Sequence, residues 1–195
     1  MGLVIAAMTM SLDGFIAFEN NEVGPLFNWY VNGGANIEIP SGGGGIKVSQ
    51  AGADFIREAS RSSGALVTGR RTFDFVHGWG GMHPMNVPVV VLTHHVPQEW
   101  VKDGSPFTFV TDGIESAIEK AQRLAGDKNI AVGTASTTQQ CLKAGLLDGI
   151  HVDLAPVLLG QGIRFFEYLG EPIELEITEV NSAPDVTHIM YRVVK

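Results

Sequence analysis

The chain has 195 residues, of which 45% are apolar and 17% are charged, so it is globular and a disordered chain is excluded. With 13 basic and 21 acidic residues its formal net charge is -8, which argues against nucleic acid or an anionic membrane as a partner. This length predicts a single domain over residues 1–195, large enough to bury a substantial core.

The N-terminal residues predict a buried strand over residues 3–10. This run is apolar but has no basic leader, and Ser11 and Asp13 end it, so it is not typical of a signal peptide. No window approaches 18 consecutive apolar residues, so we expect no segment to span a membrane. We therefore expect a cytoplasmic protein.

A long insertion follows at about residues 18–48. It is rich in glycine and asparagine, contains four consecutive glycines at 42–45, and has no assignable period. Loops of this length inside a domain are typical of lids, binding loops or disorder. A helix is then predicted from Ser49 as N-cap, with Phe55, Ile56 and Ala59 on one apolar stripe.

The middle of the chain alternates strands and helices. Apolar runs at residues 66–67, 87–92 and 107–110 predict strands, and Asp112 with Glu115 predicts a capping box for the next helix. Residues 130–132 predict another strand, which leads through a tight turn into a helix with a capping box of Ser136 and Gln139. Cys141 falls in that helix as a small buried thiol, and one cysteine excludes both a disulfide and a thiolate zinc cluster.

The C-terminal part predicts three more strands. Residues 150–154 alternate apolar and polar side chains, as in a half-buried strand, and Pro156 stops the run. Alternating runs at 173–177 and 189–193, joined by a turn at 181–185, predict an antiparallel pair at a sheet edge. The whole pattern is that of an α/β fold with a largely parallel sheet.

Two strand ends carry groups suited to phosphate. Gly69-Arg70-Arg71-Thr72 combines a flexible backbone with two guanidinium forks and a hydroxyl, although taken alone an ordinary strand end with two solvated arginines is the favoured alternative. Residues 133–137 form a second strand, turn and helix start. Both would lie on one side of a parallel sheet, so an extended ligand with two phosphates could bridge them. Neither the phosphate loop of nucleotide hydrolases nor the Gly-x-Gly-x-x-Gly fingerprint of dinucleotide-binding domains is present.

A third strand end, Thr93-His94-His95, adds a hydroxyl and two imidazoles, which suit the neighbourhood of a ligand phosphate or adenine better than a metal; an ordinary loop exit is the alternative. For proton transfer the candidates are Asp13, His83 and Glu167. Asp13 could equally be a turn residue that accepts backbone N–H bonds, and structural roles are favoured for the other two.

Five segments together carry a family resemblance. They are AAMTMSLDGFIA at residues 6–17, GRRTF at 69–73, VVVLT at 89–93, IAVG at 130–133 and DLAPVLLGQG at 153–162. In this order and spacing the chain resembles the dihydrofolate reductase-like superfamily, and within it the reductase (C-terminal) domain family of the bifunctional riboflavin-biosynthesis protein RibD. The resemblance implies a mostly parallel eight-stranded sheet flanked by helices, with antiparallel C-terminal strands.

The same resemblance implies that NADPH binds in an extended pose. Arg70 or Arg71 would hold the 2′-phosphate, Thr72 and the turn at 133–137 the pyrophosphate, and residues 93–95 the adenosine end, while the backbone of Ala7 and Ile16 would meet the nicotinamide amide. The expected cofactor contacts are Ala7, Ile16, Gly69, Arg70, Arg71, Thr72, Thr93, His94, His95, Gly133, Thr134, Ala135, Ser136 and Thr137.

Three departures from the family pattern limit what it implies. Gly133-Thr134 stands where relatives often have paired glycines, and Ala51 stands where dihydrofolate reductases carry a substrate-binding carboxylate, so folate is not the expected substrate. The zinc deaminase domain of RibD and its cysteines are not in these residues, so we do not expect a full riboflavin-pathway role. The insertion and the loop at 79–85 would instead frame the substrate pocket. Its expected residues are Trp29, Tyr30, His83, Gly160, Gly162, Phe166 and Glu167.

We therefore expect an NADPH-dependent oxidoreductase that delivers hydride to a C=N or C=O group of a small compound, such as a pterin- or pyrimidine-like heterocycle. Asp13 would orient the substrate or relay a proton, with solvent as the other proton source. The alternative is an NADP-binding module without redox turnover. The exposed edge strands of the tail would favour a homodimer.

Overall fold

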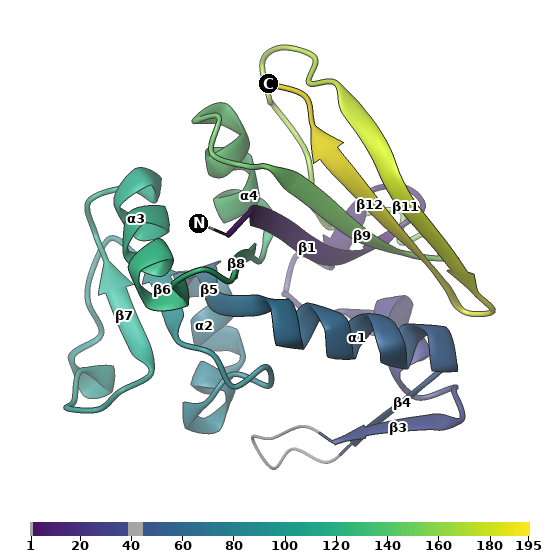
Figure 1. The fold of residues 1–195 in the computed structure, drawn as a ribbon, viewed down its shortest axis with the longest axis horizontal. Coiled ribbons are helices and arrows are strands. Elements are labelled where there is room, and N and C mark those ends of the chain that lie inside the picture. The colour runs from purple at the N-terminus through teal and green to yellow at the C-terminus, as the bar shows by residue number, and fades with distance from the viewer. Residues whose placement is uncertain (1, 39–44) are drawn as a thin grey trace.

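An eight-stranded sheet forms the centre of the structure, a computed structural model that describes residues 2–38 and 45–195 (Figure 1). The strand order is β11-β12-β9-β1-β8-β5-β6-β7. All neighbours pair in parallel except β12, which is antiparallel to both β9 and β11. The strands are β1 (Val4–Ser11), β5 (Ser63–Gly69), β6 (Val89–Leu92), β7 (Phe107–Val110), β8 (Asn129–Val132), β9 (Gly149–Ala155), β11 (Leu175–Ala183) and β12 (Val186–Val193). The predicted mostly parallel α/β fold, with its antiparallel C-terminal pair, is confirmed.

Helices cover both faces of this sheet. The core on one face joins the strands to α3 (Ile114–Ala125) and α4 (Ala135–Lys143). On the other face, α2 (Arg70–Phe75) buries Phe73 against Leu66 of β5 and two valines of β6, while α1 (Gln50–Ser62) lies over the strands nearer the centre (Figure 1). No helix in the described residues is long and apolar enough to cross a membrane.

The insertion at 18–48 is more regular than its sequence indicates. It contains a 3-10 helix, η1 (Gly24–Tyr30), and an antiparallel hairpin of β3 (Ala35–Glu38) and β4 (Gly45–Val48). Trp29 and Val48 are buried with Ala53 of α1 and Val186 of β12, so the segment folds because it packs onto the sheet. Residues 39–44, which hold most of the glycine run, lie outside the described residues. The prediction of an irregular segment was therefore wrong for the part that the structure describes.

Four short elements in the loop regions were not predicted from the sequence. The strand β2 (Phe15–Ala17) pairs with β10 (Ile163–Arg164), and two 3-10 helices, η2 (His77–Gly81) and η3 (Gln98–Trp100), follow α2 and β6. Each of these elements has five residues or fewer. Elements of that length are too short for a hydrophobic period to reveal them.

One of the three predicted caps is confirmed. The Ser49 hydroxyl accepts a hydrogen bond from the backbone N–H of Gly52 at 3.1 Å and caps α1. The capping boxes of Asp112 and Ser136 were wrong, because α3 begins after Gly113 and α4 after Thr134, and both of these residues have positive φ. Asp112 accepts from the Ser116 hydroxyl at 2.9 Å, and Gln139 donates to the Phe165 carbonyl at 3.0 Å.

Strand β9 is buried on both faces, which corrects the expectation of a half-buried strand. Its apolar residues face α3 and α4, and its polar residues, His151 and Asp153, face α1 and η1 and are also buried. The neighbouring strands set their surroundings, because Ala7 of β1 and Met190 of β12 flank His151. The polar residues of β9 therefore lie inside the molecule.

Candidate functional site

A cavity of about 820 Å³ lies beside the carboxyl ends of the central strands, between the sheet, α1, η1 and the loop around η2. Its floor includes Ala7 and Thr9 of β1 and the turn after β8. Its walls include aromatic side chains from three elements: Phe27, Trp29, Tyr30, Phe55 and Trp79. A cavity of this size that is mostly apolar with a few convergent polar groups is typical of a small-molecule site.

The predicted site residues divide into two groups. Seven of them line this cavity: Ala7, Trp29, Tyr30, Thr72, His83, Gly133 and Thr134. The remaining ones lie outside its lining: Asp13, Ile16, Gly69, Arg70, Arg71, Thr93, His94, His95, Ala135, Ser136, Thr137, Gly160, Gly162, Phe166 and Glu167. Thr137 of the second group contacts the cavity lining directly, because its hydroxyl lies 3.0 Å from that of Thr134.

The two arginines lie on α2 and point to different partners. Arg70 Nε donates to Asp74 Oδ1 at 2.7 Å, and its Nη1 donates to the His95 carbonyl at 3.0 Å. Arg71 instead donates to the carbonyl of Glu19, in the loop after β2. Adjacent residues of a helix point about 100° apart. Arg70, which follows β5, therefore links this strand to the segment that follows β6.

The turn between β8 and α4 opens toward the cavity. Gly133 has free space where a side chain would begin, since an added Cβ would meet only Leu66 Cδ1, at 3.6 Å. Thr134 has φ +78°, a strained conformation for a β-branched residue, and its hydroxyl lies 3.0 Å from that of Thr137. The Thr137 hydroxyl also donates to the Gly133 carbonyl, which helps to hold the turn in this shape.

The Asp13 carboxylate is hydrogen-bonded to the backbone of a loop. Its carboxylate accepts hydrogen bonds from the Ser11 hydroxyl at 2.5 Å and from the backbone N–H groups of Leu159 at 3.1 Å and Gly160 at 2.7 Å. The Ser11 hydrogen bond, with those of Gly160 and Leu159, lowers the pKa of Asp13 below its usual value. These contacts support the turn-residue alternative for Asp13 over a role in proton delivery.

Gly162 acts in the same loop through its backbone. Gly162 has φ +140°, and a Cβ added to it would lie 2.1 Å from the carbonyl oxygen of Ala17. Strand β10 can therefore approach β2 only with glycine at this position. Gly160 has φ +77° and open space around it. Phe166 packs against the buried Phe165 with ring centroids 4.2 Å apart, while Glu167 is exposed.

His83 lines the cavity in its neutral form. Burial lowers the pKa of His83 to about 4, and its Nδ1 accepts a hydrogen bond from the backbone N–H of Met85 at 3.2 Å. Its ring lies edge to face with Trp79, with centroids 4.7 Å apart. Near neutral pH His83 can therefore hydrogen-bond a ligand but does not hold an extra proton.

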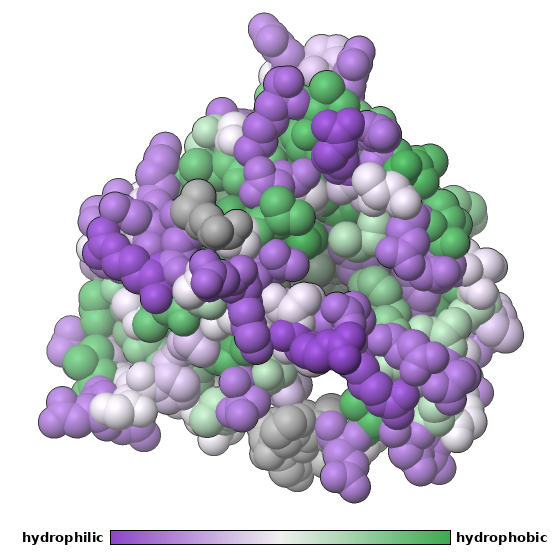
Figure 2. All heavy atoms as spheres, viewed as in Figure 1, coloured by the Kyte–Doolittle hydropathy of each residue, from purple (hydrophilic) through white to green (hydrophobic). Residues whose placement is uncertain are grey.

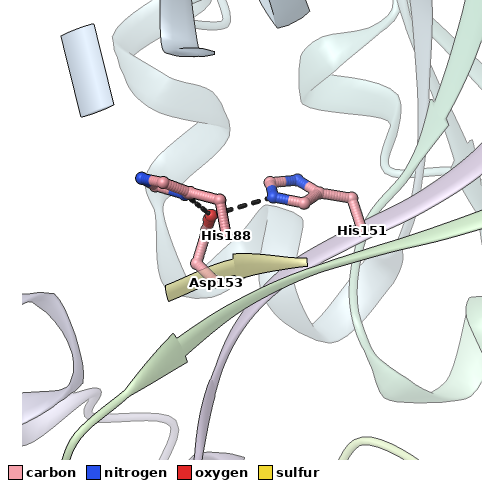
Figure 3. A group of neighbouring side chains, drawn as sticks. All are labelled: His151, Asp153 and His188. Carbon is pink, nitrogen blue, oxygen red and sulfur yellow. Dashed lines mark hydrogen bonds and ion pairs between the residues drawn. The ribbon is translucent and has the colours of Figure 1, made fainter. Parts of the chain in front are cut away.

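A buried cluster of three polar residues, His151, Asp153 and His188, was not predicted from the sequence (Figure 3). His188 Nδ1 lies 2.6 Å from Asp153 Oδ1, within hydrogen-bond geometry, and His151 Nε2 lies 3.0 Å from the same oxygen as an ion-pair contact. Burial alone would raise the pKa of Asp153, but the hydrogen bonds and charges of the two histidines outweigh it and lower the pKa. Asp153 is thus a buried carboxylate held between two imidazoles.

Asp153 also influences Tyr30 in the wall of the cavity. Burial, reinforced by the negative charge of Asp153, raises the pKa of Tyr30, so its phenol stays protonated. The sequence signal for the cluster was the alternation itself, because His151 and Asp153 are two residues apart and must share one face of a strand. Nothing local indicated that His188 would lie beside them.

Comparison with known proteins gives one family and a common fold. The family described as RibD C-terminal domain matches residues 3–189. No curated protein sequence matches the chain. A protein of Shewanella sp. PV-4 described as a riboflavin biosynthesis protein is similar in structure, with a TM-score of 0.76, 22% identity and coverage of 99% of each chain.

Two further structures have the same fold at lower identity. RibD of Acinetobacter baumannii gives a TM-score of 0.65 at 16% identity over 100% of this chain and 59% of that chain. Dihydrofolate reductase of Enterococcus faecalis, solved in complex with NADP(H), gives a TM-score of 0.61 at 16% identity over 100% of this chain and 98% of that chain.

Proposed function

The chain belongs to the RibD C-terminal domain family, and from this premise we propose that it is an NADPH-dependent reductase of a small heterocycle with a pyrimidine- or pterin-like ring. One observation carries the proposal. A single cavity joins the open Gly133 turn, which suits a pyrophosphate, to Ala7 and to an aromatic wall with buried polar groups. That arrangement offers room for a dinucleotide and for a flat ring next to it.

The residues at the turn fit a dinucleotide cofactor. The space above Gly133 is a cradle that a Cβ would fill, and the strained Thr134 holds the turn in the shape that leaves it open. A pyrophosphate there would meet the backbone N–H groups at the start of α4. The proposed contact for the 2′-phosphate is Arg70, because it lies against residues 93–95, whereas Arg71 turns toward residue 19.

The other cavity residues orient the substrate. NADPH supplies a hydride when bound, and the protein has to hold the acceptor ring and exclude water. Trp29 and Phe55 offer apolar faces, the protonated phenol of Tyr30 can donate a hydrogen bond, and the indole Nε1 of Trp29 is a buried donor without a partner in the described residues. Ala51 lies outside the lining of this cavity, and no carboxylate of α1 is placed there as in dihydrofolate reductases.

Calorimetric titration with NADPH and NADH tests the cofactor assignment. The wild type should bind NADPH more tightly than NADH, and Gly133→Ala should keep the thermal midpoint but weaken NADPH at least tenfold, because the new methyl group occupies the pyrophosphate cradle. Gly34→Ala is the matched control, since an added Cβ there meets nothing within 4 Å and lies away from the cavity. A wild type that binds no NADPH would end the proposal.

Turnover distinguishes the reductase from a binding module. NADPH oxidation is followed at 340 nm, the dihydronicotinamide absorbance, with dihydropterins, aminopyrimidines and quinones as acceptors. We expect oxidation with at least one ring that contains a C=N bond. Tight NADPH binding without oxidation across all three classes would favour the module without redox turnover.

A further inference from the structure

The buried cluster lies on one row of three adjacent strands. Thr9 of β1 is paired with Asp153 of β9, and Asp153 is paired with His188 of β12. The next row along the same face contains Ala7, His151 and Met190. The strand register therefore brings two imidazoles and a carboxylate next to Ala7, where the proposed cofactor would place its nicotinamide.

The three side chains have different access to the cavity. His151 and Asp153 line it, whereas His188 lies behind them, stacked on Phe55 with centroids 4.8 Å apart and edge to face with Trp29 at 5.4 Å. The exposed fraction is 4% for His151, 8% for Asp153 and 2% for His188. His188 is thus placed to hold the carboxylate, and His151 is placed to meet a ligand.

The buried charge of Asp153 is compensated by its neighbours. A buried carboxylate is costly unless a positive charge or hydrogen-bond donors compensate it. In the cluster these donors are the two imidazoles and the Thr9 hydroxyl, which lies 3.5 Å from Asp153 Oδ2. For His151, Nε2 is buried 3.0 Å from Asp153 Oδ1 without forming a geometrically defined hydrogen bond, so Nδ1 is the nitrogen left for a ligand in the cavity.

His151 also lines a second cavity. This cavity has a volume of about 500 Å³, and its lining includes Glu58, Glu179 and Asn181. Both cavities share His151 and Phe55. Figure 2 shows a hydrophilic band across this face of the molecule, where α1 lies in Figure 1, so the second cavity is bordered by polar side chains.

We propose that His151 is the catalytic acid of the reaction, that Asp153 is a positioning residue that fixes its tautomer, and that His188 holds Asp153 in place. The inference rests on the proposed reductase function. As the substrate carbon accepts the hydride, the π electron pair of its C=N bond moves to nitrogen and takes the proton from His151 Nδ1. The substrate gains one hydride and one proton, the cofactor is oxidised by two electrons, and the neutral His151 takes a new proton from water.

Histidine spectra test the proposal without any substrate. Long-range 1H–15N correlation spectra of the NADP+-saturated protein should show neutral His151 with its proton on Nε2, the tautomer that leaves Nδ1 free to receive and donate a proton. Asp153→Asn should remove this tautomer preference, whereas His77→Asn, at an exposed histidine outside the cavity, should leave it unchanged. A neutral ring with its proton on Nδ1, or a tautomer that does not respond to Asp153→Asn, would overturn the proposal.

Kinetics with the acceptor found by the turnover assay provide the second arm. His151→Gln should lower kcat by about 10²- to 10⁴-fold, the usual effect of losing a general acid, while the Kd for NADPH changes less than twofold. Unchanged kcat in His151→Gln, with a wild type that oxidises NADPH, would refute the acid role and leave the reductase function standing.

A metal ion is the competing occupant, because the three donor atoms lie within 4.8 Å of one another. The wild type is therefore dialysed against EDTA and titrated with Co2+, whose visible spectrum reports nitrogen ligands. We expect no stoichiometric binding and no loss of turnover after EDTA. Tight Co2+ binding that disappears in His151→Gln, with activity that requires the metal, would replace the proton-donor role.

Discussion

Arg70→Ala should weaken NADPH and leave NADH unaffected. Arg70 Nε and Nη1 are occupied by Asp74 and the His95 carbonyl, which orients the fork and leaves Nη2 without a hydrogen bond in the described residues. One charge-assisted hydrogen bond contributes about 1.5–3 kcal/mol. Because 31% of the side chain is exposed, water screens the contact, and the lower part of that range, about 1.5–2 kcal/mol, is expected. This corresponds to about a 10- to 30-fold rise in the Kd for NADPH.

Arg71→Ala is the matched control for this experiment. Its guanidinium bonds the Glu19 carbonyl, away from residues 93–95, so the Kd for NADPH should change less than twofold. Both variants are titrated with NADPH and NADH by calorimetry at low and moderate salt, because a phosphate contact also weakens with ionic strength. Equal losses for the two nucleotides, or a larger loss in Arg71→Ala, would refute the assignment of Arg70 to the 2′-phosphate.

Three further predictions concern stability and reactivity. Gly162→Ala should lower the free energy of unfolding by about 3 kcal/mol or more, because the new Cβ clashes with the backbone of β2. Gly160→Ala should lower it by only about 1–2 kcal/mol, the cost of its positive φ. Equal losses for the two variants in urea unfolding would contradict this. Burial raises the pKa of Cys141 to about 12, so iodoacetamide should label this thiol only in the unfolded protein, and rapid native labelling would argue against the packing of α4. Burial alone would raise the pKa of Asp148, but hydrogen bonds from Lys195 and a backbone N–H of β1 lower it. The stability it contributes is therefore present above the unfolded pKa of about 3.9 and lost as pH falls through the lower folded pKa, so urea unfolding at pH 7 and pH 3 should show Asp148→Asn and wild type converging in acid.

The parts of the fold that sequence could predict are those set by local chemistry. Ser49 caps α1 because its own side chain reaches the N–H three residues on. The caps at Asp112 and Ser136 failed because the neighbouring residues, Gly113 and Thr134, take positive φ and start the helices instead. Local pattern gave the existence of these helices but not the backbone conformation at their first turn.

The insertion was unpredictable for a different reason. Trp29 and Val48 are buried in a cluster that includes Val186, which lies far along the chain. A window of sequence around either residue contains no sign of that partner. Tertiary packing therefore decided whether this stretch forms regular structure.

The same contrast between local chemistry and long-range packing applies to the candidate site. The strand ends at Gly69 and Gly133 could be located from the sequence because each follows an apolar run, while the phosphate role of the residues there stays a prediction. The cluster of Asp153 and His188 could not be predicted, because its geometry depends on β12 lying beside β9. Strand order in a sheet follows from the whole topology and not from any single segment.

The sheet order also determines when the site can form during folding. The central strand β1 is the first strand of the chain, but it pairs only with β8 and β9, and its Thr9 is 144 positions from its partner Asp153. Closing such long loops is entropically costly, and contacts of this separation form late and slowly. During synthesis β1 therefore remains without either neighbour until most of the chain has emerged. Its apolar residues stay unpaired in that interval, which makes it a segment that a chaperone can bind.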